Sequence, residues 1–132
     1  MTPFASPQVQ AAFDAFPAHL RPGLLQLREL IFATAAKDKT IGPLEECLKW
    51  GQPAYLTSAT KSGTTLRLGV SKKTQGKALF VHCQTRLVAD FQTQFPDTLS
   101  FDGTRALLLS DDADLADGKT QLFIQRALTY HL

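Results

Sequence analysis

The sequence predicts an α+β domain, with an antiparallel sheet of about five strands and helices packed on it. Three observations predict this class. Residues 64–70 alternate apolar and polar side chains, which is the period of a half-buried strand. Asp102-Gly103 separates two apolar segments, as in a tight β-hairpin. Residues 21–36 carry a broad apolar arc at helical spacing, suited to packing on a sheet. The predicted order is α-α-α-β-β-β-α-β-β-α, and its short connections favour antiparallel pairing.

The first third of the chain is predicted to be helical. Ser6 followed by Pro7 favours a helix over residues 7–16, because serine caps a helix and proline is preset for its first position. A second helix is predicted over residues 21–36. All 132 residues are expected to form one domain, in which residues 1–20 are an N-terminal helical extension.

A third, short helix is predicted between Gly42-Pro43 and Gly51. Proline again favours the first helical position, and glycine readily adopts the left-handed conformation that ends a helix. Pro53 disfavours a helical conformation in the residue before it. We therefore expect a strand to begin at Ala54.

Two pairs of side chains follow from this helix. Glu46 and Trp50 would lie one turn apart on one flank, and Glu45 would form an ion pair with Lys49 at the favourable i,i+4 spacing. Arg28 falls inside the apolar arc of the preceding helix, where a charged side chain must either snorkel to solvent or find a carboxylate. We predict that Arg28 pairs with Glu46 or Glu45.

The remaining elements follow the same kinds of pattern. Apolar periodicity and turn residues predict strands at 64–70 and 78–83, a helix at 85–95, a hairpin of 99–101 with 104–109, an acidic loop at 111–117 and a helix at 120–130. His82 and Cys83 would point to opposite faces of their strand, so they are not expected to act as a catalytic pair.

Composition excludes several classes. A hydrophobic content of 44% with 20% charged residues is typical of a globular domain rather than of disorder, and no apolar run approaches the length of a membrane span. The N-terminal segment lacks the pattern of a secretory signal. Cys47 and Cys83 are therefore expected to be buried, reduced thiols in a cytoplasmic protein.

Common catalytic and cofactor motifs are missing from the sequence. It has no Gly-Lys-Ser/Thr phosphate loop, Gly-x-Gly-x-x-Gly, Gly-x-Ser-x-Gly or Cys-x-x-Cys. We therefore expect a binding protein rather than an enzyme, with no cofactor and with its oligomeric state open, a homodimer included.

The best candidate site is the corner that holds the single tryptophan. An indole, a phenol and a carboxylate around one corner suit a pocket for a small molecule or a protein partner. The alternative is that Trp50 and Tyr55 pack between helix and sheet. The candidate ligand-binding residues are Arg28, Glu46, Trp50, Pro53 and Tyr55.

A basic segment offers a further option. Residues 61–77 hold five basic residues and no acid, so Arg67, Lys72, Lys73 and Lys77 are candidates for anion binding. The run lacks interleaved aromatic residues for base stacking, and nucleic-acid binding is not expected.

Several motifs carry a family resemblance over residues 20–132. The chain resembles the YdhG-like family, bacterial domains of unknown function, and the resemblance implies no reaction. The motifs are Leu27-Arg28-Glu29-Leu30-Ile31, Glu46-x-x-x-Trp50-Gly51-x-Pro53-x-Tyr55, Gly69 with its basic loop, and Phe101-Asp102-Gly103-Thr104-Arg105.

One branch of that family is described as a frataxin-like intracellular iron chaperone. By resemblance, iron would be held by carboxylates, whose hard oxygen ligands suit transient delivery of such a cation. The candidate metal ligands are Glu45, Glu46, Asp111, Asp112 and Asp114.

Overall fold

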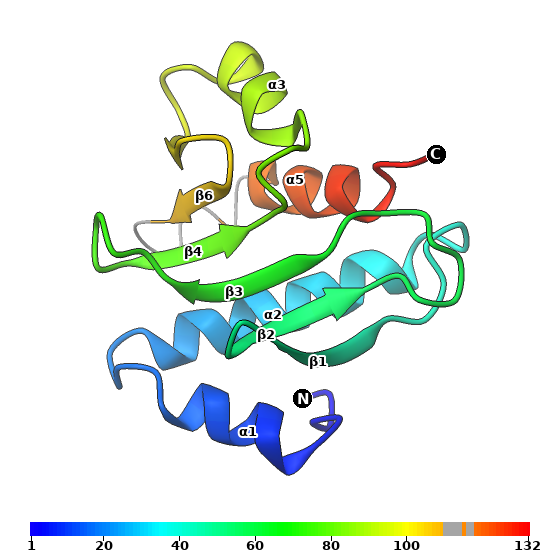
Figure 1. Cartoon of the computed structure of the whole chain (residues 1–132), viewed down its shortest axis with the longest axis vertical. Coiled ribbons are helices and arrows are strands. Elements are labelled where there is room, and N and C mark those ends of the chain that lie inside the picture. The colour runs from blue at the N-terminus through cyan, green and yellow to red at the C-terminus, as the bar shows by residue number, and fades with distance from the viewer. Residues whose placement is uncertain (110–114, 116–117) are drawn as a thin grey trace.

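The computed structural model describes residues 1–109, 115 and 118–132. Over these residues the chain forms a six-stranded antiparallel sheet with strand order β1-β2-β3-β4-β6-β5 and helices packed on it, which confirms the α+β class (Figure 1). The elements are α1 (Pro7–Asp14), α2 (Arg21–Ala36), β1 (Glu45–Lys49), β2 (Gln52–Leu56), β3 (Leu66–Val70), β4 (Lys77–Phe80), α3 (Leu87–Gln94), β5 (Ser100–Asp102), β6 (Ala106–Leu109) and α5 (Lys119–Leu128).

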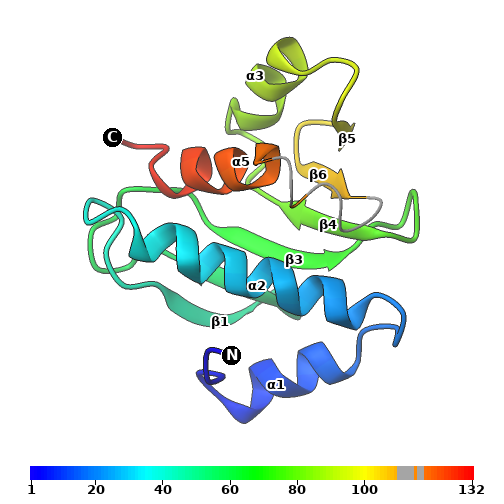
Figure 2. The same cartoon turned by 180° about the vertical axis from the view of Figure 1, so that it is seen from behind.

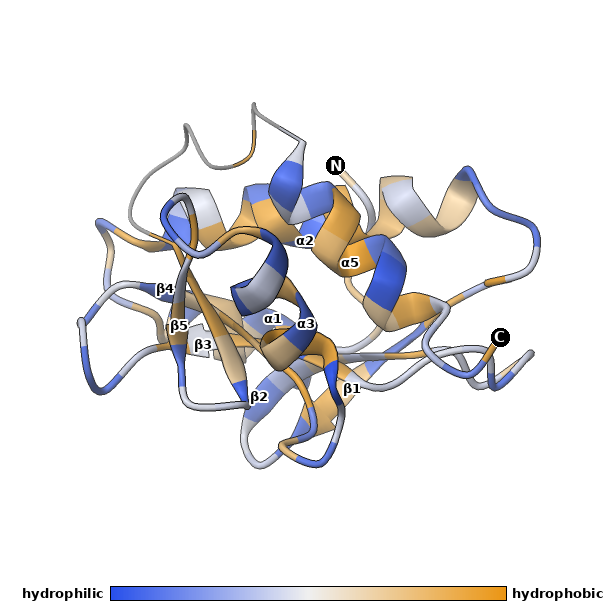
Figure 3. Cartoon of the chain, turned by 90° about the horizontal axis from the view of Figure 1, so that it is seen from above, coloured by the Kyte–Doolittle hydropathy of each residue, from blue (hydrophilic) through white to orange (hydrophobic). Residues whose placement is uncertain are grey.

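Two helices cover one face of this sheet. The strands stand in front of α2 and α5 in Figure 1, and the same two helices stand in front of the strands in Figure 2. Both helices contain stretches of hydrophobic residues (Figure 3), and their buried residues belong to the core shared with the strands. The core between the layers is fully buried and includes Leu27 of α2, Leu68, Leu79 and Leu107 of the central strands, and Phe123 of α5. In the described part of the chain, no helix covers the opposite face, which we call the open face.

Most predicted elements are confirmed. Ser6 Oγ accepts a hydrogen bond from Val9 N at 3.2 Å, so it caps α1, and α2 spans the predicted residues 21–36. The predicted hairpin is β5–β6, but its turn has three residues, 103–105, because Asp102 pairs with Ala106. Gly103 has a φ of +55°, which glycine tolerates because it has no Cβ.

The predicted third helix is wrong. Residues 45–49 form strand β1, which pairs with β2 as a hairpin and makes the sheet six-stranded rather than five-stranded. Lys49 pairs with Gln52, and the two residues between them, Trp50 and Gly51, have φ values of +55° and +75°. Gly51 is left-handed as expected, but it closes a two-residue hairpin turn rather than a helix.

Two other expectations fail with that helix. Glu45 and Lys49 cannot form the predicted ion pair, because they stand four positions apart on an extended strand, a distance of about 13 Å. The Glu45 carboxylate instead accepts a hydrogen bond from Ser58 Oγ. Cys83 is exposed rather than buried, because β4 ends at Phe80, while Cys47 is half-buried and both thiols are free.

None of the described helices combines the length and the apolar character that a membrane crossing requires.

Candidate functional site

The structure divides the predicted corner site between the two sides of the sheet. Glu46 and Tyr55 are paired residues of β1 and β2, so their side chains share the helix-covered face, where both are buried. Pro53, two residues before Tyr55, is buried too. Trp50 lies in the hairpin turn and is 90% exposed. The predicted pocket around all four residues does not form.

Arg28 completes the buried half of the site. Its guanidinium is fully buried, and it holds Glu46 through two hydrogen bonds, Nε to Oε2 at 2.6 Å and Nη2 to Oε1 at 3.0 Å. Tyr55 Oη donates to the same Glu46 Oε2 at 2.8 Å. The predicted pairing of Arg28 is therefore confirmed with Glu46 and not with Glu45.

This cluster is electrostatically fixed. Burial alone would raise the pKa of Glu46, but hydrogen bonds from Arg28, Tyr55 and Ala5 outweigh it and hold that pKa below its ordinary value. Burial, reinforced by the Glu46 carboxylate, raises the pKa of Tyr55 far above its ordinary value. The phenol therefore stays neutral and the carboxylate charged at neutral pH, so neither is poised for proton transfer.

The lowered pKa of Glu46 predicts a specific loss of stability in acid. A carboxylate whose pKa is lower in the folded than in the unfolded chain stabilises the fold above the unfolded value, and the contribution disappears as the pH falls through the folded value. We expect the unfolding free energy to decrease as the pH is lowered through about 4.5, where the carboxyl group of the unfolded chain is about half protonated. In urea unfolding, Glu46→Gln should flatten this decline.

Glu45→Gln is the matched control, because Glu45 is exposed on the same strand and is not bonded to Arg28. It should retain the wild-type pH profile. An unchanged acid decline in Glu46→Gln would show that Glu46 is not its source.

A second cluster lies on the open face of the sheet. Arg67 of β3 is half-buried, donates from Nη1 to Gln52 Oε1 at 2.9 Å and places its guanidinium 5.5 Å from the centre of the Phe80 ring. Burial lowers the pKa of Arg67, although an arginine remains charged at neutral pH. Within the described residues, no carboxylate forms an ion pair with it.

Arg67 borders a shallow hollow of about 170 Å³. The lining residues come from the end of β1 and the turn after it, from β3 and the residues just before it, and from the segment after β4: Lys49, Trp50, Thr65, Arg67 and His82. His82 Nδ1 accepts a hydrogen bond from Gln84 N at 3.2 Å, which leaves Nε2 to carry the proton and donate. The hollow thus combines an indole, two cations and further polar donors.

The conformation of Trp50 singles it out. A φ of +55° is strained for a bulky side chain and costs about 1–2 kcal/mol, and exposure of the indole recovers no burial energy. Asparagine suits this turn position better. The fold therefore gains little from the Trp50 indole, and this strained, exposed position makes Trp50 a candidate contact residue.

Of the basic residues named from the sequence, the structure brings only Arg67 to this hollow. Lys77 is buried against Gly23 of α2, and Lys72 and Lys73 lie in the exposed β3–β4 turn. The sequence pattern does not group Lys49, Thr65 and His82 with Trp50, because the Trp50-Gly51 turn resembles a helix end and the other two residues lie on distant segments. Gly51, which suits the positive φ of a two-residue hairpin turn, is the available hairpin signal.

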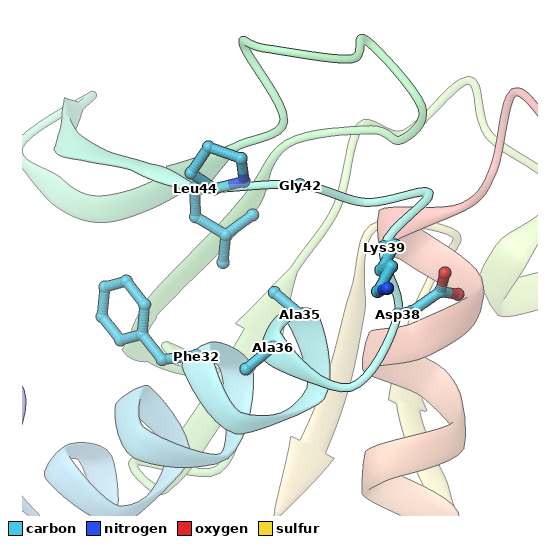
Figure 4. Close-up of a pocket in the computed structure, with 8 residues that line it drawn as sticks. Phe32, Ala35, Ala36, Asp38, Lys39, Gly42 and Leu44 are labelled. Atoms are coloured by element: carbon cyan, nitrogen blue, oxygen red, sulfur yellow. The ribbon is translucent and has the colours of Figure 1, made fainter.

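A larger hollow of about 420 Å³ lies at the end of α2 (Figure 4). Phe32, Ala35 and Leu44 face it, with Asp38 and Lys39 on the side away from Phe32. The Asp38 carboxylate already accepts hydrogen bonds from Thr40 N and Oγ1. Since its walls are largely apolar and Asp38 is engaged, this hollow has less means of selecting a ligand than the Trp50 hollow.

Of the predicted metal ligands, only Glu45 and Glu46 lie among the described residues, and each is bound to a different partner. Glu46 is held by Arg28 and Tyr55, and Glu45 accepts from Ser58. The described residues contain no group of three or more His, Cys, Asp or Glu side chains that could hold a metal. Asp111, Asp112 and Asp114 lie outside the described residues.

No family model matches the chain, and neither the curated proteins nor the solved structures contain a significant match to it.

Proposed function

We propose that this protein is a binding module for an anionic group attached to an apolar or planar body, recognised between Trp50 and Arg67. The observation that carries the proposal is the strained, 90% exposed Trp50 beside a half-buried arginine with no acidic partner in the described structure. The indole supplies a surface for the apolar body, and the guanidinium supplies donors for a carboxylate or a phosphate.

The surroundings of Arg67 favour this ligand chemistry. A charge pair at a half-buried guanidinium is less screened than one in open solvent, so an incoming anion gains more there than at an exposed lysine. Lys49 adds a second cation and His82 a further donor. At about 170 Å³ the hollow is smaller than most enclosed ligand pockets, so it suits the end of a small molecule or one protruding side chain of a partner.

The compartment proposed for this binding module is the cytoplasm. Cys47 and Cys83 are both free thiols, as cysteines in reducing compartments usually are.

Fluorescence of Trp50 provides a direct test, because it is the only tryptophan. We expect phenyl phosphate to shift or quench its emission saturably, with a dissociation constant of about 1 mM as befits so small a ligand. Arg67→Gln should weaken this binding at least tenfold, the size expected for loss of one charge-assisted hydrogen-bonded contact. Added salt should weaken it too.

Arg126→Gln is the matched control, since Arg126 is an exposed arginine on α5 and should leave the affinity unchanged. Trp50→Asn keeps a residue suited to the turn and removes the indole; calorimetry should then show weaker binding in a fold at least as stable. Equal affinities of the wild type and Arg67→Gln, or no saturable signal up to about 10 mM phenyl phosphate, would refute the proposal.

A further inference from the structure

The N-terminal segment, residues 2–5, supplies acceptors that complete the hydrogen bonds of the buried Arg28 guanidinium. A guanidinium has five N–H donors. Two are used on Glu46, at 2.6 and 3.0 Å, and one on Glu29 Oε2 at 2.8 Å. The remaining two reach backbone carbonyl oxygens of the segment, Thr2 O at 2.7 Å and Pro3 O at 3.0 Å.

The two carboxylates beside Arg28 accept hydrogen bonds from N–H and O–H groups of the same segment. Glu29 Oε1 accepts from Thr2 N at 3.1 Å and from Thr2 Oγ1 at 2.8 Å, while Glu46 Oε1 accepts from Ala5 N at 3.1 Å. The Phe4 ring lies 4.4 Å from the Arg28 guanidinium carbon. Main-chain hydrogen bonds with one anchoring side chain are the pattern by which proteins bind extended peptides.

The binding surface is held independently of the segment it binds. Arg28 belongs to α2 and Glu46 to β1, and Tyr55 fixes the Glu46 carboxylate from β2. The segment itself is peripheral, since Pro3 and Ala5 are exposed and Thr2 and Phe4 are half-buried. Figures 1 and 2 both place the start of the chain beside β1 and α1, at the edge of the sheet. Such a segment detaches at far lower cost than the fold that carries it.

We propose that Arg28, Glu29 and Glu46 form a receptor for a short extended peptide, and that residues 2–5 fill it as an intramolecular competitor. The ligand would present two successive carbonyl groups to Arg28, amide N–H groups to the glutamates and an aromatic side chain in the place of Phe4. When the segment leaves, two donors of the Arg28 guanidinium lose the carbonyl groups of Thr2 and Pro3. Another peptide backbone that supplies two carbonyl groups restores these charge-assisted bonds and covers the guanidinium again. This receptor is separate from the Trp50 hollow, on the other side of the sheet.

The test uses the full chain and a C-terminally labelled peptide with the sequence of residues 2–6, N-acetylated so that its first N–H remains an amide. Phe4→Ala weakens attachment of the segment and changes none of the three receptor residues. The receptor is therefore unoccupied for a larger fraction of the time. Fluorescence anisotropy should show that Phe4→Ala binds this peptide at least tenfold more tightly than the wild type. Phe16→Ala, which removes an aromatic ring packed on Phe13 outside the segment, should bind it like the wild type.

A peptide with alanine in place of its phenylalanine should bind at least tenfold more weakly to Phe4→Ala. Equal peptide affinities of the wild type and Phe4→Ala would overturn the proposal. A second measurement needs no variant: in the wild type, excess peptide should speed hydrogen exchange of the Ala5 amide, which bonds to Glu46, and leave core amides such as Leu68 unchanged. Unchanged exchange at Ala5 would also overturn it.

Discussion

Replacing Arg28 by methionine is expected to lower the free energy of unfolding by about 3–5 kcal/mol. Methionine fills much of the same volume, so the loss comes from the partners that remain. Glu46 keeps its charge in a buried position, 8% exposed, with only Tyr55 and Ala5 as donors. The carbonyl groups of Thr2 and Pro3 also lose their donors. Urea unfolding at neutral pH measures the change.

Arg126→Met is the matched control, because Arg126 is exposed on α5, and it should change the unfolding free energy by less than about 0.5 kcal/mol. Adding Glu46→Leu to Arg28→Met should recover part of the loss, because removing both partners of a buried ion pair is less costly than removing one. A loss below about 1 kcal/mol in Arg28→Met would mean that the pair contributes little to the fold.

The Arg28–Glu46 pair shows why the sequence predicts the ion pair correctly but does not predict strand β1. Arg28 stands inside the apolar arc of α2, and its need for a carboxylate was enough to predict the pairing that the structure confirms. Glu46, however, points from β1 toward the helix-covered face, where it is paired with the buried Tyr55 of β2. A charged residue at an inward position breaks the alternation of a strand, so residues 45–49 resembled a helix.

The residues of the Trp50 hollow are brought together by strand pairing, which a local sequence pattern does not reveal. Arg67 meets Phe80 through the β3–β4 register, and Trp50 and His82 reach the same hollow from segments far apart in the chain. A two-residue period assigns faces to side chains but does not say which strands are neighbours. The sequence therefore supplied Arg67 and Trp50 as separate candidates, and pairing of the strands brings them to one hollow.

The β1–β2 hairpin relates the two proposed sites. Its strand residue Glu46 is bonded to Arg28 and accepts from Tyr55 on the helix-covered face, while its turn presents Trp50 to solvent. A site on a turn is positioned well only if the strands beneath it are rigid. The buried ion pair would therefore support the recognition proposed at Trp50, although it takes no part in the proposed contact.

Gly63→Ala is expected to lower the free energy of unfolding by about 3 kcal/mol, from overpacking against backbone that cannot move aside. A Cβ at this position would lie 2.4 Å from the carbonyl carbon of Leu128 and 2.5 Å from Ala127 O. The loop is tied to the end of α5 there, since Thr64 N donates to Ala127 O at 2.9 Å and Ser62 Oγ donates to Leu128 O at 2.8 Å. Relieving the overlap breaks these bonds and uncovers the last turn of α5.

Gly51→Ala separates this overlap from simple backbone strain. Gly51 has a φ of +75° and nothing within 4 Å of its Cβ position, so alanine there should cost only about 1–2 kcal/mol.

The Gly63 loop leads directly into Thr65 and Arg67, which line the Trp50 hollow. Gly63→Ala should therefore also weaken phenyl phosphate binding, under conditions where the variant remains folded by circular dichroism. If Gly63→Ala is as stable as the wild type, the loop docks on α5 less tightly than these distances indicate. If Gly63→Ala is destabilised but binds phenyl phosphate with wild-type affinity, the hollow does not depend on that docking.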